Sequence, residues 1–209
     1  MLTDSQAELR PDPAVNLALL RAGGDDVEFD RQLADLLGEF ARTLGTDFAI
    51  QSILDHLVAR VVSVLPVSAA GITLASTDTG AAYIAASDAA ALRYAQLQIE
   101  SREGPGLTAF RTGKVVAVSD LRTDDRFPNF ASGAQHEALL AVFAFPLRRG
   151  DDQLGALELY RLVAGPLEAG AMMAAQTLAD VAAAYLINAR SAPTAARSHL
   201  AAGRQPSRS

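Results

Sequence analysis

The residues with the clearest chemical potential lie in the strand pattern LGALELY at residues 154–160, where apolar residues alternate with Glu158 and Tyr160. Because successive side chains of a strand point to opposite faces, Glu158 and Tyr160 are expected on one face and the flanking leucines on the other. A carboxylate and a phenol on one face can hydrogen-bond a polar ligand. The alternative is that both groups are satisfied within the protein, with Glu158 paired to an arginine such as Arg102 or Arg122.

The sequence shows no catalytic constellation. It contains no cysteine, which excludes thiol nucleophiles, disulfides and thiolate metal sites. Three histidines are scattered, and the His136-Glu137 pair lacks the second histidine of a zinc-protease helix. Asp120, Asp124 and Asp125 lack the spacing of a calcium loop. We therefore predict neither a catalytic site nor a metal site.

A second informative stretch runs from Glu103 to Phe130, EGPGLTAFRTGKVVAVSDLRTDDRFPNF. It combines a Gly-Pro-Gly turn, a short helix, a valine-rich strand and an acidic loop that Phe127 is expected to anchor. The helix start at Gly104-Pro105-Gly106 could attract an anion through its backbone N–H groups. Proline removes one donor and no lysine follows, so a rigid turn is the favoured interpretation.

Apolar periodicity predicts a fold of the α+β class. Two helices begin at Asp30 and Thr46, and Ser87 caps a third. Pro166 lies in the first turn of a last helix that runs to about Arg190. Strands are predicted at 68–76, 80–87 and 114–119, and a further helix is predicted at 129–137. The strands 139–147 and 153–160 are predicted to form a hairpin.

Composition bounds the domain organisation and the partners. Of 209 residues, half are apolar and a fifth are charged, and the net charge is −6. We predict a flexible acidic leader at 1–29, one domain at 30–190 and a disordered arginine-containing tail at 191–209. The acidic body makes nucleic acid an unlikely partner. No signal peptide and no bilayer-spanning apolar run is recognised, so we expect no membrane contact and a cytoplasmic location.

In order and spacing, several short motifs resemble a GAF domain over residues 30–189. They are EGPGL at 103–107, FRTG at 110–113, VSDL at 118–121, RFP at 126–128, AFPL at 144–147 and LGAL at 154–157. The chain is similar to actinobacterial GAF domains that often precede an RNA-binding ANTAR module, although the segment 191–209 is too short to form one. The output partner is therefore expected to be a separate chain.

The resemblance implies a GAF/PAS-like antiparallel sheet of about five to six strands. Its first, second and last long helices would cover one face, and short helices and loops would cover the other. A small molecule can bind beneath those loops. Glu158 and Tyr160 would then lie under the lid, with Arg122 and Phe127 contributed by the acidic loop.

Phe143 and Phe145 share one strand face and are candidates for the wall of this pocket. Their alternative role is plain core. The ligand, and any cofactor, is unknown.

The last helix carries two adjacent apolar seams, one through Leu178 and Tyr185 and one through Met172 and Leu186. One seam covers a sheet, so the second must pack on another helix or on a partner. The resemblance to GAF sensors suggests a homodimer through the first, second and last helices. Burial of both seams within one monomer is the alternative.

We therefore predict a non-enzymatic sensory or regulatory domain that binds a small molecule and signals through a helical dimer. The GAF-fold methionine sulfoxide reductases work through cysteine, which is absent here. The alternative function is a ligand-free GAF scaffold that serves dimerisation or protein interaction.

Overall fold

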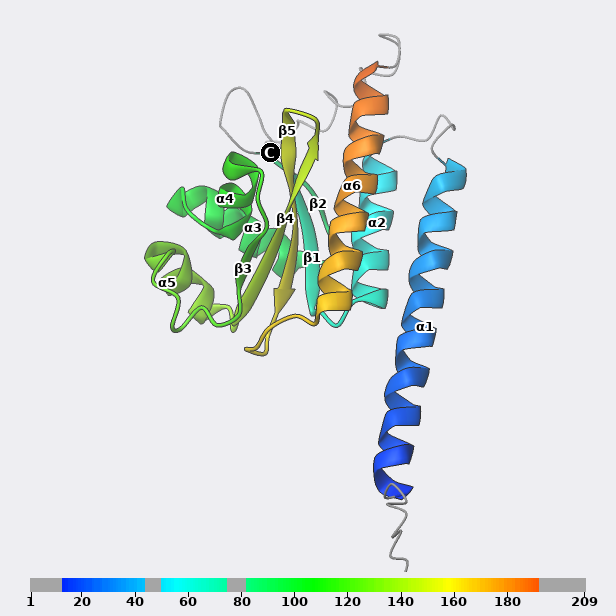
Figure 1. The fold of residues 1–209 in the computed structure, drawn as a ribbon. Coiled ribbons are helices and arrows are strands. Elements are labelled where there is room, and N and C mark those ends of the chain that lie inside the picture. Colours follow the sequence, from blue (N-terminus) through cyan, green and yellow to red (C-terminus); the bar gives the residue numbers. More distant parts are fainter. Residues whose placement is uncertain (1–12, 44–49, 75–81, 192–209) are drawn as a thin grey trace, which may run out of the picture.

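The computed structural model describes residues 13–43, 50–74 and 82–191. A five-stranded antiparallel sheet lies between two layers of helices (Figure 1). The elements are α1 Pro13–Thr43, α2 Ile50–Val64, β1 Ala69–Leu74, β2 Ala82–Ala86, α3 Ala89–Ser101, α4 Pro105–Thr112, β3 Val116–Val118, α5 Pro128–His136, β4 Ala141–Arg149, β5 Asp152–Arg161 and α6 Ala169–Ser191. The α+β class and the division of long and short helices between the two faces are as predicted.

The sheet has the strand order β2-β1-β5-β4-β3, so β5 is its central strand. Register pairs Glu158 of β5 with Gly71 of β1 on one side and with Ala144 of β4 on the other. Both cross-strand neighbours are therefore small. This leaves room above the middle of the sheet for the long side chain of Glu158.

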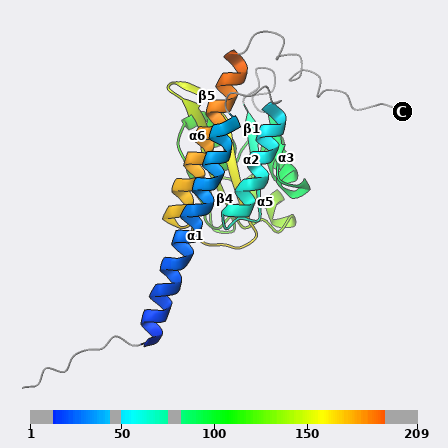
Figure 2. The same cartoon turned by 90° about the vertical axis from the view of Figure 1, so that its right-hand side faces the viewer.

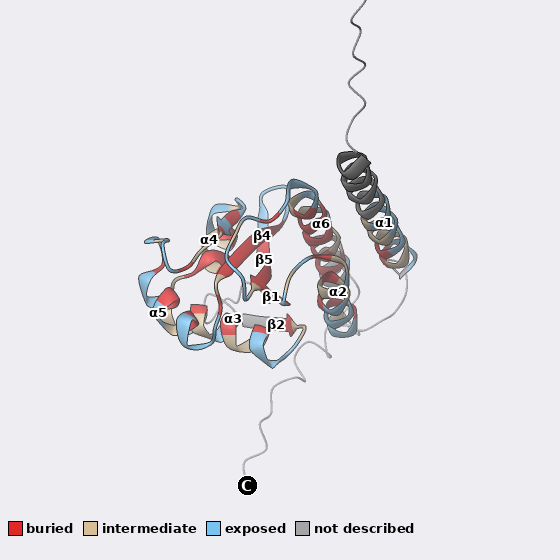
Figure 3. Cartoon of the chain, turned by 90° about the horizontal axis from the view of Figure 1, so that it is seen from below, coloured by how far each residue is buried: buried red, intermediate tan, exposed pale blue. Residues whose placement is uncertain are grey.

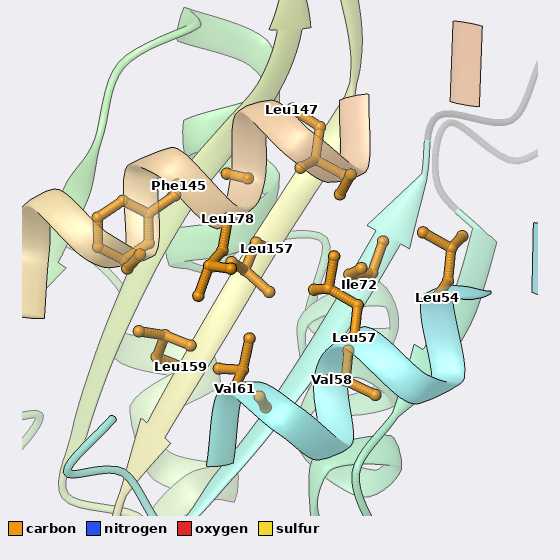
Figure 4. Close-up of a cluster of buried hydrophobic side chains, with 14 of the residues drawn as sticks. Leu54, Leu57, Val58, Val61, Ile72, Phe145, Leu147, Leu157, Leu159 and Leu178 are labelled. Carbon is orange, nitrogen blue, oxygen red and sulfur yellow. The ribbon is translucent and has the colours of Figure 1, made fainter. Parts of the chain in front are cut away.

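The helix-side core confirms the predicted alternation of β5. Leu157 and Leu159 pack with Phe143 and Phe145 of β4 in the core beneath the long helices. These four side chains are at most 1% exposed. Figure 4 shows Leu157, Leu159 and Phe145 on the side of the sheet that faces α2 and α6. Burial of such side chains, at about 25 cal/mol per Å² of apolar surface, is the main driving force for this layer.

The lid-side core is a second apolar cluster on the opposite face of the sheet. It contains Val118, Phe127, Phe130 and Tyr94 together with Tyr160. Seen from below the molecule, buried residues line the strands and the inner surfaces of the helices on both sides (Figure 3). The sheet is therefore covered on both faces, and polar groups at its centre are removed from water.

The first helix begins earlier than the sequence predicts. α1 starts at Pro13, so residues 13–29 extend it instead of forming a flexible leader; the acidic residues that suggested a leader are tolerated in a helix. Its later half packs on α2 and α6 through Leu36 and Phe40, while its beginning projects past the end of the sheet layers (Figure 2). Residues 1–12 of the predicted leader lie outside the described residues, as do residues 192–209 of the tail predicted at 191–209; Ser191 is the last residue of α6.

Both predicted seams of α6 are covered within the monomer. Leu178, Tyr185 and Leu186 are at most 5% exposed, whereas Met172 is half-buried. The Tyr185 hydroxyl also donates a hydrogen bond to the backbone carbonyl of Phe40 on α1. The first and second helices thus supply the surface that the second seam requires, and the seam alone gives no argument for a dimer.

By length and composition alone, α6 could cross a membrane over Ala169–Asn188, so the expectation that no segment meets these requirements is wrong. Half of this window is buried inside the structure. Core helices of soluble proteins meet the same test, because a helix that packs on a sheet and on other helices is apolar on most sides.

Two helix starts also differ from the sequence-based prediction. Asp88, not Ser87, caps α3: its carboxylate accepts the Ala91 N–H at 2.8 Å, while the Ser87 hydroxyl accepts the Ala70 N–H at 3.0 Å. Both residues are good caps in isolation. Pairing with β1 draws Ser87 into the sheet and leaves the cap to Asp88. The last helix begins at Ala169, so Pro166 precedes it.

The α6–sheet contact can be tested by truncation. Leu178→Ala should lower the free energy of unfolding by about 2–5 kcal/mol, because the fully buried side chain leaves a cavity between α6 and β5. Met173→Ala is the matched control, since Met173 lies on the same helix and is 69% exposed. Urea unfolding measures both. Equal small losses would contradict the described packing of α6.

Candidate functional site

Glu158 is the centre of a buried polar cluster beneath the short helices. The side chain is 1% exposed. Its Oε1 accepts the Thr73 hydroxyl at 2.7 Å, and its Oε2 accepts the Tyr160 hydroxyl at 2.6 Å and the Gln98 side-chain amide. Strands β1 and β5 and helix α3 therefore each present a neutral donor to one carboxylate.

Burial sets the electrostatics of this cluster. Removal of the carboxylate from water raises the pKa of Glu158, and the hydrogen bonds from Tyr160, Thr73 and Gln98 act in the opposite direction. A buried carboxylate without hydrogen bonds would cost several kcal/mol more. The donors thus offset a cost that the position of Glu158 on the central strand creates.

Helix α4 lies directly on the carboxylate through Gly106. The Gly106 N–H donates to Gln98 Oε1 at 2.8 Å, so Gln98 bridges the first turn of α4 and Glu158. A Cβ atom at position 106 would lie 2.7 Å from Glu158 Oε2 and closer still to the rest of the carboxyl group. Only glycine therefore permits this close approach.

Glu103 connects the turn before α4 to α5, the second short helix that covers this part of the sheet. Its carboxylate accepts the Phe130 N–H at 2.9 Å and the Asn129 side-chain amide at 3.0 Å, and it also accepts the Asn129 N–H. These backbone groups lie at the start of α5, where helix N–H groups otherwise have no partner. The favoured prediction of a rigid turn at 104–106 is compatible with this arrangement, since Glu103 and Gly106 anchor its two sides.

An aromatic pair borders the cluster. The rings of Tyr94 and Tyr160 have centroids 5.0 Å apart, and the Tyr94 hydroxyl donates to the Glu137 carbonyl at 3.1 Å. Burial raises the pKa of Tyr94. Tyr160 is fully buried, so its hydroxyl meets Glu158 and not bulk water. The packing of the two rings fixes the direction of that hydrogen bond.

The structure brings together only part of the predicted site. Glu158 and Tyr160 lie on the lid side of the sheet, as the alternation predicts. Phe143 and Phe145 lie on the opposite side, in the core beneath the long helices. Their candidate role as pocket wall is therefore wrong and their alternative role as core is correct, because β4 pairs antiparallel with β5 and places Phe143 opposite Leu159.

The two loop residues are also apart from Glu158. Arg122 is exposed, and its guanidinium pairs with Asp120 at 2.7 Å; this hydrogen bonding lowers the pKa of Asp120 to about 2. The alternative in which Arg122 pairs with Glu158 is therefore wrong, and Arg102 is exposed at the left-handed C-cap of α3. Phe127 is buried in the lid-side core, consistent with an anchor for the loop.

Arg122 instead borders an open groove on the surface. The groove has a volume of about 290 Å³ and runs between the acidic loop and α5, past Asp124, Asp125 and Gln135. Asp124 is already paired with Arg126 at 2.6 Å. The charges of the loop are thus largely satisfied locally.

Sequence reasoning missed Thr73, Gln98 and Gly106 as members of the cluster. Thr73 is the polar residue in an otherwise apolar strand pattern, and Gln98 lies on the buried side of α3, so each carried a weak signal. Gly106 carried a stronger one, since a second glycine beside Pro105 suggests close packing. That all three residues meet at Glu158 could be seen only in the tertiary structure.

The comparisons with known proteins agree with this architecture. A family model described as GAF domain matches residues 49–186. The chain belongs to the GAF domain family. No curated protein matches the sequence significantly.

Several solved structures share this GAF fold. The GAF domain of a phosphoenolpyruvate-protein phosphotransferase from Coxiella burnetii is 16% identical, with 77% of this chain and 95% of that chain covered and a TM-score of 0.60. The free methionine-R-sulfoxide reductase from Neisseria meningitidis is 12% identical, with 78% and 90% covered and a TM-score of 0.58. The chromophore-binding domain of a bacteriophytochrome from R. palustris is 13% identical, with 75% and 60% covered and a TM-score of 0.54. At these identities the likeness concerns the fold alone.

The close contact of α4 with Glu158 predicts that replacement of Gly106 lowers the stability of the fold. Gly106→Ala should lower the free energy of unfolding by about 1–3 kcal/mol, because the added methyl group overlaps the carboxylate. Gly170→Ala is the matched control: its added Cβ meets nothing within 4 Å in helix α6, so it should be neutral or stabilising by up to about 1 kcal/mol. Chemical denaturation distinguishes the two, and a neutral Gly106→Ala would refute the close approach.

The raised pKa of Glu158 predicts a defined pH dependence. The folded state holds the Glu158 proton more tightly than the unfolded state, so this group favours folding below its ordinary pKa. That contribution is lost as the pH rises through the window up to the raised pKa. Glu158→Gln does not titrate, so the stability of this variant relative to wild type should increase across that window.

Thermal unfolding of both proteins at a series of pH values measures this difference. Thr73 and Gln98, which face Glu158, carry no titratable group, so they do not mask this difference. A difference that stays constant with pH would show that Glu158 has an unshifted pKa.

Proposed function

We propose that this chain is a non-enzymatic sensory domain that binds a small molecule at the Glu158 site beneath α4 and signals through the long helices. Membership of the GAF family, which is commonly sensory or regulatory, supports the general role. The observation that carries the proposal is the buried, hydrogen-bonded carboxylate beneath a lid of short helices. Natural cores rarely bury a carboxylate at this cost, so a functional role is a reasonable explanation.

Strand β5 offers a direct route from this site to the long helices. Glu158 and Tyr160 face the lid, whereas Leu157 and Leu159 on the same strand pack in the core with α2 and α6. A shift of β5 that alters one face must therefore be accommodated by the other. A ligand can use this route only if its affinity differs between two arrangements of the helices.

Entry of a ligand requires movement of α4. Gly106 lies on the Glu158 carboxylate, and Gln98 connects the two. Such movement would break the Gly106 N–H bond to Gln98 and the apolar contacts of buried Ala109 with the lid-side core, and it would leave the pairing of the strands intact. The lid would hence act as a gate whose closed form is the one described here.

The proposed output is a homodimer formed through α1, α2 and α6. The first half of α1 projects beyond the sheet layers, so a second copy could lie beside it without a clash with the sheet (Figure 1). Twofold symmetry is the commonest arrangement for such pairs. We further propose a cytoplasmic location, no membrane contact and a separate output protein, in keeping with an acidic chain without cysteine.

The absence of cysteine also supports a non-enzymatic role. One structural neighbour is a methionine-R-sulfoxide reductase, but thiol chemistry is unavailable to this sequence. The described cluster contains hydroxyl, amide and carboxyl groups without an imidazole to act as a base. Its chemistry suits hydrogen bonding more than turnover.

A second candidate is a ligand-free GAF scaffold for dimerisation or protein interaction. One observation favours it: Glu158 already accepts hydrogen bonds from Thr73, Gln98 and Tyr160 in the unliganded chain. A site satisfied in this way needs no external partner for stability. The two candidates predict different responses to small molecules.

A thermal-shift screen of nucleotides, amino acids and keto-acids separates them. A specific ligand should raise the Tm of the wild-type protein in a concentration-dependent manner. Glu158→Leu combined with Tyr160→Phe should abolish that shift while the oligomeric state, measured by light scattering, stays unchanged. Glu168→Leu, an exposed change beside α6, is the matched control and should retain the shift.

The outcomes are distinct. No shift with any compound would favour the scaffold. A double variant that loses the dimer but keeps the shift would show that the sensing and dimer surfaces are assigned to the wrong faces. A wild-type protein that is monomeric at all concentrations would refute the dimer proposal and leave ligand binding as a separate question.

A further inference from the structure

We infer that this domain contains a binding site for a small carboxylate beneath α4, and that its own Glu158 side chain occupies that site. The inference goes beyond the proposed function, because it assigns a chemical class to the site and does not require a cellular ligand.

The donor set matches a carboxylate. The Thr73 hydroxyl donates to one oxygen of Glu158, while the Tyr160 hydroxyl and the Gln98 amide donate to the other. These three side chains are 7%, 0% and 2% exposed, so each is committed to the interior. None carries a charge. Both oxygens of a planar, acceptor-only group are therefore recognised by neutral donors on three different elements.

The space is shaped around a group of this size. Gly71 and Ala144 flank Glu158 on the neighbouring strands and leave the centre of the sheet open. Gly106 closes the space from above and approaches the carboxyl group too closely to carry a side chain. The walls thus fit a carboxylate on a short aliphatic stem and exclude a bulky branched group.

The Gln98 side chain connects the carboxylate in the site to helix α4 of the lid. Its amide nitrogen donates to Glu158, and its carbonyl oxygen accepts the Gly106 N–H at 2.8 Å. Position 104 has φ +148°, and a Cβ atom there would lie 2.7 Å from the Gln98 side-chain Cδ. Two glycines hence allow the turn to enclose Gln98, and a carboxylate in the site orients the residue that docks α4.

Because the Glu158 side chain is covalently attached to β5, it can occupy the site in place of a free carboxylate. A side chain held on β5 loses no translational freedom when it binds, whereas a free carboxylate does. Free acetate should therefore not compete with Glu158 in the wild-type protein. When the tethered group is removed, the same donors become available to a free carboxylate.

Chemical rescue of Glu158→Ala tests this inference. The substitution removes Cγ and the carboxyl group, which are the four heavy atoms that acetate supplies. Acetate should raise the Tm of Glu158→Ala by about 2–4 °C once it exceeds its dissociation constant several-fold. Chloride at equal ionic strength should not, and wild type should show no acetate-specific shift.

A donor-deficient variant provides the matched control. Gln98→Leu combined with Glu158→Ala removes the amide that the anion would meet, so the acetate-specific shift should be lost. Pivalate is the size control, because its branched carbon should be excluded by Gly106 and the sheet. Equal shifts with acetate and chloride, equal shifts in the double variant, or an acetate shift in wild type would each overturn the inference.

If Glu158→Ala does not fold without added acetate, a refolding experiment still tests the inference. Glu158→Ala would then be refolded from urea in acetate and in chloride, and the folded fraction would be measured by resistance to proteolysis. Greater recovery in acetate supports a carboxylate site, and equal or absent recovery in both overturns it. The ligand screen above first detects a ligand with wild type, whereas this test adds acetate to Glu158→Ala. The proposed function and this inference can therefore fail independently.

Discussion

The structure depends on one buried group, the carboxylate of Glu158. Its place on the central strand of a sheet covered on both faces removes it from water, and its pKa is raised by that burial. Such a group is tolerated only when hydrogen bonds offset the cost. Thr73, Gln98 and Tyr160 supply these bonds, and through Gln98 the same network seats α4. The need to hydrogen-bond the buried Glu158 carboxylate thereby contributes to the position of α4 on the sheet.

The two faces of the sheet carry different kinds of constraint. The helix side is a continuous apolar core in which Phe143, Phe145 and Leu178 fill space. The lid side combines apolar packing around Phe130 with directional bonds at Glu158. Hydrogen bonds require defined distances and angles, whereas apolar packing requires that the space be filled. The lid side therefore constrains the orientation of α4, and the helix side constrains the spacing between the sheet and the long helices.

Much of the fold could be predicted from sequence because its patterns are local. Alternation in 154–160 assigns Glu158 and Tyr160 to one face, and the helical periodicity of 30–44 marks the packed half of α1. Other features are not local. The transfer of the α3 cap from Ser87 to Asp88 depends on the pairing of Ser87 with β1, and the placement of Phe143 and Phe145 on the helix side depends on the pairing of β4 with β5. The candidate site was partly predicted for the same reason. Glu158 and its donor Tyr160 are recognisable in one strand, but the other two donors, Thr73 and Gln98, are 85 and 60 residues away in the chain.

By itself, the sequence determined the α+β class, the two-faced character of β5 and, through the motifs around Glu103 and Gly106, a resemblance to GAF domains that the family match at 49–186 confirms. The first two follow from periodicity, which acts over a few residues, and the third rests on the likeness of short motifs to those of a known family. Only the tertiary structure decided that Gly106 lies against Glu158, that Gln98 joins them, and that the sheet together with α1 and α2 covers both seams of α6. Those contacts join residues far apart in the chain, and their geometry exists only once the sheet register and helix packing have brought them together.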